Sequence, residues 1–114
     1  MATYVHYNAD HPDVEGFYTP YFGRLSDQEL AIVADAHDRD LLHFATQLER
    51  NRADIDTYEA DWCACAGPGG DAFATHFAEK LLAHHRHMLG RTLVDIETTS
   101  RIIAVCAAEI ARRA

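Results

Sequence analysis

A dense cluster of helix-breaking residues near the middle of the chain constrains the fold more than any other feature. Gly67-Pro68-Gly69-Gly70 separates two long stretches with helical periodicity. Proline lacks a backbone N–H and clashes with the preceding turn, and glycine admits positive φ, so a helix is expected to stop here. The chain should therefore reverse at this cluster and lay its two halves antiparallel.

The first half carries the signals of one long helix. Ser26 and Glu29 have the spacing of a capping box, in which each side chain bonds the other residue's backbone N–H. After it, seam positions recur with the 4-3-4-3 spacing of a heptad pattern. These features predict a helix from about Asp27 to Tyr58–Trp62, with the polar seam residue Asn51 setting the register and partner choice rather than adding stability. The seam comprises Leu30, Ala34, His37, Leu41, Phe44, Leu48, Asn51, Ile55, Tyr58 and Trp62.

The second half is predicted to be a helix with apolar residues on two adjacent rows. Asp71 is a suitable N-cap. Gly90 interrupts the pattern but not its register, which favours a continuous or kinked helix over a break. Two rows present more apolar surface than one neighbouring helix can cover, so we expect a helical bundle formed by a dimer. The rows are Phe73, Phe77, Leu81, His84 and Met88, and Leu82, His85, Leu89, Thr92, Ile96, Thr99, Ile103, Cys106 and Ile110.

The N-terminal segment differs from the helical halves. It is rich in aromatic residues and holds two of the three prolines, Pro12 and Pro20. We interpret it as an extended arm whose rings pack against the helices. The sequence therefore predicts an all-α fold: an aromatic arm over residues 1–25 and an antiparallel two-helix hairpin domain over residues 26–114. The aromatic residues of the arm are Tyr4, Tyr7, Phe17, Tyr18, Tyr21 and Phe22.

Four aromatic residues around the turn are the candidate binding residues. Trp62 and Phe73 flank the glycine cluster and are expected to meet across the hairpin, packed against Tyr58 and Phe77. Large aromatic side chains bury much surface, so this cluster would close the turn. The alternative is an exposed Trp62 that enters a pocket of a partner, as interface hot spots do.

Composition excludes several functions. A formal net charge of −8 has the wrong sign for binding nucleic acid or an anionic membrane surface. No apolar stretch has transmembrane length, so we expect no membrane insertion. The N-terminal sequence lacks the features of a classical signal peptide, and three cysteines fit a reducing compartment better than a disulfide framework. These observations predict a cytoplasmic location.

No motif for catalysis or metal binding stands out. Folding about Gly67 would bring His43, Gln47, His84 and His87 near one another, but the Glu-x-x-His and His-Glu-x-x-His patterns of helical metal sites are absent. We therefore expect no catalytic residue, no metal site and no cofactor. A small metal-binding or catalytic helical-bundle protein, such as an accessory protein of a biosynthetic pathway, stays open as the alternative.

Two long helices joined at a tryptophan-bearing turn resemble the WXG-type proteins of type VII (ESX) secretion systems, and most of all the small secretion-associated proteins of actinobacteria. The matching residues are Trp62-Cys63-Ala64 and the stretch from Gly67 to Phe73, with Ala64 where the family has glycine. The family's C-terminal Tyr-x-x-x-Asp/Glu signal is absent, because Val105 precedes Glu109 by four residues. The resemblance implies a non-enzymatic protein–protein interaction subunit, a homodimer or heterodimer, and secretion by the type VII route.

Overall fold

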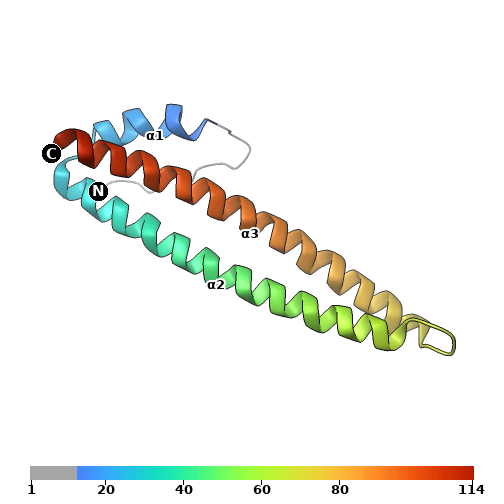
Figure 1. Ribbon diagram of the computed structural model, residues 1–114. Coiled ribbons are helices and arrows are strands. Elements are labelled where there is room, and N and C mark those ends of the chain that lie inside the picture. The colour runs from blue at the N-terminus through green and yellow to red at the C-terminus, as the bar shows by residue number, and fades with distance from the viewer. Residues whose placement is uncertain (1–12) are drawn as a thin grey trace. The chain divides into compact units, whose positions relative to one another are not determined.

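The computed structural model describes residues 13–114, and every element in this range is an α-helix. The helices are α1 (Val14–Gly23), α2 (Asp27–Cys65) and α3 (Ala72–Arg113) (Figure 1). The prediction of an all-α chain built on two long helices is confirmed. The predicted roles of Tyr4, Tyr7 and Pro12 fall outside the described residues.

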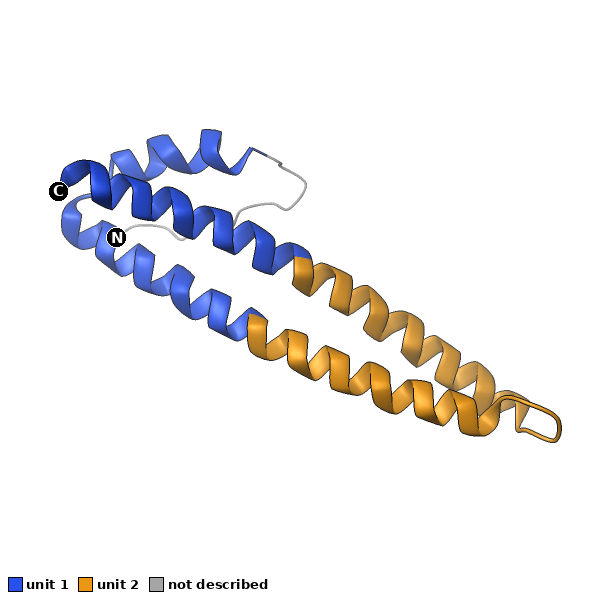
Figure 2. Ribbon diagram, in the orientation of Figure 1, with its two compact units in different colours: residues 1–44, 94–114 blue, residues 45–93 orange. Residues whose placement is uncertain are grey.

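The chain divides into two compact units (Figure 2). Unit 1 comprises residues 1–44 and 94–114, so its described part holds α1, the first half of α2 and the last part of α3. Unit 2 comprises residues 45–93 and is a helical hairpin. Each long helix therefore contributes to both units. The predicted boundary between residues 25 and 26 lies inside unit 1.

The prediction of an extended arm is wrong for residues 14–23, which form α1. The Asp13 carboxylate caps this helix by accepting from the Gly16 N–H at 2.9 Å. Pro20 lies inside the helix, where proline is normally unfavourable. Burial of the apolar face outweighs this cost, because tertiary packing overrides local propensity. The core of unit 1 consists of Val14, Tyr18, Phe22, Leu30, Ile102 and Cys106.

An ion pair at the start of α1 and a hydrogen bond at its end join it to the other helices of unit 1. Arg101 of α3 binds Glu15 at 2.8 Å, which lowers the pKa of that carboxyl. Arg113 donates to the Phe22 carbonyl at the end of α1, to Asp27 at the start of α2 and to Glu109, each at 2.9 Å. Arg112 and Arg113 together lower the pKa of Glu109 to about 2. The last turn of α3 thus ties together the start of α2 and the end of α1.

The predicted starts of both long helices are confirmed. Ser26 and Glu29 exchange two hydrogen bonds of 3.0 and 3.1 Å, which is the predicted capping box. The Asp71 carboxylate accepts from the N–H groups of Phe73 and Ala74 at the start of α3. Helix α2 ends at Cys65, a few residues beyond the predicted end.

The turn between the helices depends on its glycines. Gly69 has a φ of 81°, a backbone conformation that residues with a side chain rarely adopt. A Cβ atom on Gly70 would lie 1.9 Å from the Cys65 carbonyl oxygen, so the chain can fold back over the end of α2 only with glycine there. The predicted reversal at this cluster is confirmed.

Unit 2 is an antiparallel hairpin because rising residue numbers on α2 pair with falling numbers on α3. Asn51 bonds Thr92, and Trp62 bonds Glu79. A reversal centred on Gly67 predicts that Asn51 and Trp62 lie opposite α3 residues several positions earlier than Thr92 and Glu79. The observed partners lie later in α3 because α2 continues to Cys65. Helix α3 is continuous through the exposed Gly90.

Candidate functional site

Trp62 lies at the edge of the hairpin rather than inside a cluster. The residue is 38% exposed, and its indole Nε1 donates to Glu79 Oε1 of α3 at 3.2 Å. Glu79 and Phe77 are two residues apart on α3, so they point to opposite sides of that helix. Trp62 therefore lies on the side of unit 2 away from Phe77.

Phe73 and Phe77 are exposed instead of packed against Trp62. They are 79% and 58% exposed, and within the described residues neither ring pairs with another ring. The prediction that Trp62 and Phe73 are buried against each other is wrong. The reason is that the seam of α3 runs through Ala78 and Leu82, which leaves Phe73 and Phe77 on the outer side of the helix.

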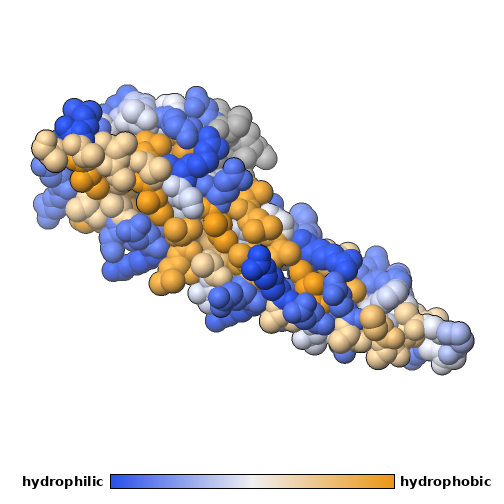
Figure 3. Space-filling view, viewed as in Figure 1, coloured by the Kyte–Doolittle hydropathy of each residue, from blue (hydrophilic) through white to orange (hydrophobic). Residues whose placement is uncertain are grey.

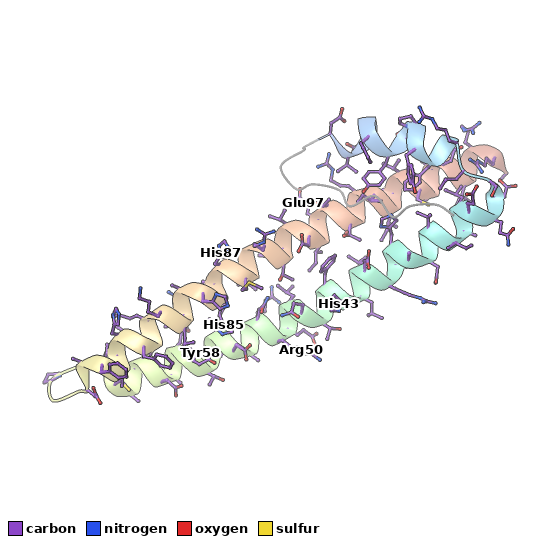
Figure 4. The ribbon with its side chains drawn as sticks, turned by 180° about the vertical axis from the view of Figure 1, so that it is seen from behind. His43, Arg50, Tyr58, His85, His87 and Glu97 are labelled. Atoms are coloured by element: carbon purple, nitrogen blue, oxygen red, sulfur yellow. The ribbon has the colours of Figure 1, made fainter. Side chains whose placement is uncertain are left out.

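Tyr58 makes a different contact from the one predicted. Its ring stacks on His85 of α3 with centroids 4.9 Å apart, and both side chains lie between the two helices of unit 2 (Figure 4). His85 Nδ1 is 3.7 Å from Asp54 Oδ2, and this buried nitrogen has no hydrogen-bond partner. The four candidate residues are thus separated: Tyr58 in the seam, Trp62 on one side, Phe73 and Phe77 on another.

The two phenylalanines begin a continuous exposed row along α3, which we call the outer row. Its members follow one another at intervals of four and three residues, so they share one face of the helix. Figure 4 shows His87 on the side of α3 away from α2. Every member is exposed, and the row contains no acidic residue. The outer row comprises Phe73, Phe77, Lys80, His84, His87 and Arg91.

Charge is segregated between the two helices of unit 2. The α2 segment 45–65 carries Glu49, Asp54, Asp56, Glu59 and Asp61 against only two arginines. The α3 segment 72–93 carries Glu79 as its one acid, and the Glu79 carboxylate accepts the hydrogen bond from Trp62. Arg86 binds Glu59 at 3.0 Å across the hairpin, whereas Lys80 and Arg91 form no ion pair within residues 13–114. A cationic face therefore exists on a chain whose net charge is −8.

A buried polar network joins the two helices of unit 2. Asn51 Nδ2 donates to Thr92 Oγ1 at 3.0 Å, and Gln47 Nε2 donates to Asn51 Oδ1 at 3.2 Å. The Thr92 hydroxyl in turn donates to the Met88 carbonyl. Buried polar groups of this kind fix register because a slipped pairing would leave them without partners.

Among the described residues, no group of three or more His, Cys, Asp or Glu could hold a metal ion. Cys63, Cys65 and Cys106 are free thiols, and burial raises the pKa of Cys106, which belongs to the core of unit 1. His37 is also buried in unit 1, and desolvation lowers its pKa despite the nearby Asp38 and Asp40.

The outer row was not recognised from the sequence as a unit. The apolar row predicted from the sequence continues instead from Phe77 to Leu81 and Met88, and these two residues are half-buried beside the seam. The signal was the placement of Lys80 seven residues after Phe73 and of Arg91 fourteen residues after Phe77, in a segment almost free of acids. Figure 3 shows one face of the molecule, on which hydrophobic residues reach the surface between hydrophilic ones.

Comparisons of the chain with protein-family models, with curated proteins and with solved structures find no match. Within residues 13–114, no helix is both long enough and apolar enough to cross a membrane.

Proposed function

We propose that this chain is a non-enzymatic helical interaction subunit that resembles the type VII secretion-associated proteins and acts as one half of a dimer. The exposure of Phe73 and Phe77 on adjacent turns of α3 carries this proposal. Two large apolar rings side by side on a helix are unfavourable in water, and contiguous exposed apolar surface marks interaction sites. Phe, Tyr and Trp also supply a large part of the contact area at interfaces.

The form of the chain supports the same function. Helices of 39 and 42 residues, joined by a glycine-rich turn soon after Trp62, agree with the two-helix pattern on which the resemblance rests. The turn is fixed by its own glycines and by the Asp71 cap, so Phe73 and Phe77 are not needed to close it. Their side chains are thus available for a partner, and the proposed route from the cell is type VII secretion.

Photo-crosslinking in the producing organism tests this proposal. A photoreactive amino acid replaces Phe77 in one variant and Ile32, which is 63% exposed in unit 1, in a matched control. We expect one defined protein adduct at position 77 and not at position 32. The purified partner should bind the chain in sedimentation velocity, and Phe73→Ser with Phe77→Ser should weaken that binding at least tenfold. No adduct at position 77, or the same adducts at both positions, would contradict the proposal.

Secretion is tested separately by following the chain in culture medium. The proposed route predicts that the chain leaves intact cells and that export stops when the type VII ATPase is inactivated. Retention inside wild-type cells under every growth condition would remove the secretion part and leave the interaction part standing.

A further inference from the structure

We infer that the outer row of α3 binds an acidic amphipathic helix supplied by a different protein. This inference rests on the proposed function and assigns the chemistry of the partner. The row presents Phe73 and Phe77 near the turn and Lys80, His84, His87 and Arg91 beyond them. A helix laid along this row meets apolar surface at one end. Beyond it, the helix meets the cationic side chains of Lys80 and Arg91 and the two imidazole rings between them.

Charge complementarity favours an acidic partner. Lys80 and Arg91 form no ion pair within the described residues, unlike Arg86, which is held by Glu59. Burying either cation at an interface without a counter-charge would be costly, whereas a carboxylate on the partner compensates for the lost hydration.

A second copy of this chain fits the row less well. If two outer rows pack against each other, Lys80 and Arg91 enter the interface from both copies and no acid accompanies them. The acidic α2 of a second copy supplies carboxylates, but its segment 45–65 exposes no large apolar side chain other than Trp62. Within unit 2 of a second copy, neither helix therefore offers acidic and apolar groups together on the scale of the row.

The partner helix needs a defined pattern. Since consecutive members of the outer row are three or four residues apart, a helix packed along it presents apolar residues at the same spacing. Acidic residues should flank that apolar row over the part that faces Lys80 to Arg91. Helix-in-groove recognition by other domains uses the same spacing of anchors.

Two synthetic helices test the inference on the full chain. One carries leucine in a single heptad row with glutamate on both sides, and the other carries lysine in place of each glutamate. Fluorescence anisotropy of the labelled helices gives the affinities at low ionic strength. The net charge of −8 alone would favour the lysine helix. We expect instead that the glutamate helix binds at least tenfold more tightly, and that added salt reduces this preference.

Matched variants assign any preference to the outer row. Lys80→Glu with Arg91→Glu should abolish or reverse the preference for the glutamate helix. Arg50→Glu with Arg52→Glu makes the same change of charge on exposed positions of α2 and should leave the preference nearly unchanged. Phe73→Ser with Phe77→Ser should weaken binding at least tenfold, and circular dichroism verifies that each variant keeps its helices.

The outcomes separate the two proposals. Tighter binding of the lysine helix that still depends on Phe73 and Phe77 would overturn the acidic partner and leave the interaction function standing. A dimer of the chain alone that Phe77→Ser dissociates in sedimentation velocity would assign the row to a second copy instead. If neither helix binds and position 77 gives no crosslinked partner, both proposals are wrong.

Discussion

His37 makes the stability of unit 1 depend on pH. Its side chain is buried with its ring edge-on to Tyr18 and Phe22, at centroid distances of 6.1 and 6.3 Å. Burial lowers the pKa of His37 below its ordinary value of 6.5. As the pH falls below 6.5, the unfolded chain therefore takes up a proton that the folded chain resists. Stability is expected to decline with acidification from that point.

The melting temperature measured between pH 8 and pH 5 tests this expectation. The wild-type chain should lose thermal stability below about pH 6.5, whereas His37→Gln should be less sensitive over the same range. Glu109 acts at lower pH. Because its pKa of about 2 lies below the ordinary 4.5, its contribution is present above pH 4.5 and lost as the pH falls toward 2. Equal pH sensitivity of wild type and His37→Gln would show that another group is responsible.

Asn51 and Thr92 are expected to couple energetically. Asn51→Ala removes the donor to Thr92 and the acceptor of Gln47 inside the hairpin. Leaving buried polar groups without partners typically costs about 1–3 kcal/mol, whereas replacing both partners by apolar groups can be neutral or stabilising. Urea denaturation should show this loss for Asn51→Ala. The double variant Asn51→Leu, Thr92→Val should match or exceed wild type. If the single variants Asn51→Leu and Thr92→Val change the free energy of unfolding by amounts that add up to the change in the double variant, the two residues do not interact.

At the scale of single helices, the glycines of α3 and of the turn should respond oppositely to the same substitution. A Cβ on Gly90 meets nothing within 4 Å, so Gly90→Ala should stabilise α3 by about 0.5–1 kcal/mol. Gly69 has a φ of 81°, so Gly69→Ala should destabilise the turn although space is available. Thermal melts of the two variants compare them directly. A destabilising Gly90→Ala would indicate that α3 needs the flexibility of glycine there.

The elements that sequence reasoning predicted correctly are those whose signals are local. The capping box at Ser26 and Glu29 and the cap at Asp71 depend on residues within three positions of each other, and heptad spacing reports the seam. Pro12 and Pro20 favour the extended arm that the sequence predicts, whereas packing of its apolar face makes residues 14–23 helical. The signals of α1 itself were the Asp13 cap and the row of Val14, Tyr18 and Phe22 at intervals of four, all buried in the structure.

The candidate surface was predicted only in part because it depends on which face of α3 meets α2. Phe73 and Phe77 were identified from the sequence, yet they were assigned to the inside of the turn. The seam instead uses Ala78 and Leu82. Because neighbouring residues of an α-helix point about 100° apart, a shift of one residue selects a different face. The bond from Trp62 to Glu79 and the stacking of Tyr58 on His85 involve residues far apart in sequence, which spacing alone does not reveal.

At the scale of the whole molecule, the two units differ in what they bury. Unit 1 has a core of large apolar side chains that includes Tyr18, Phe22 and Leu30. Unit 2 buries Ile55 and Leu82 together with the polar Asn51 and Thr92, and it leaves Phe73 and Phe77 exposed. Local opening is easier where few apolar contacts must be broken. We therefore expect the hairpin of unit 2 to open more often than the helices of unit 1.

Hydrogen exchange followed by mass spectrometry measures this difference, because peptides from both parts of α2 and α3 are compared in one experiment. Amides in residues 45–93 should exchange faster than those in residues 27–44 and 94–113. A bound partner stabilises the state to which it binds. Adding the purified partner that crosslinking at position 77 identifies should therefore slow exchange most over residues 73–91. Asn51→Leu with Thr92→Val should slow exchange in unit 2 without a partner. Uniform exchange along both long helices would mean that they open as one cooperative unit and would contradict this prediction.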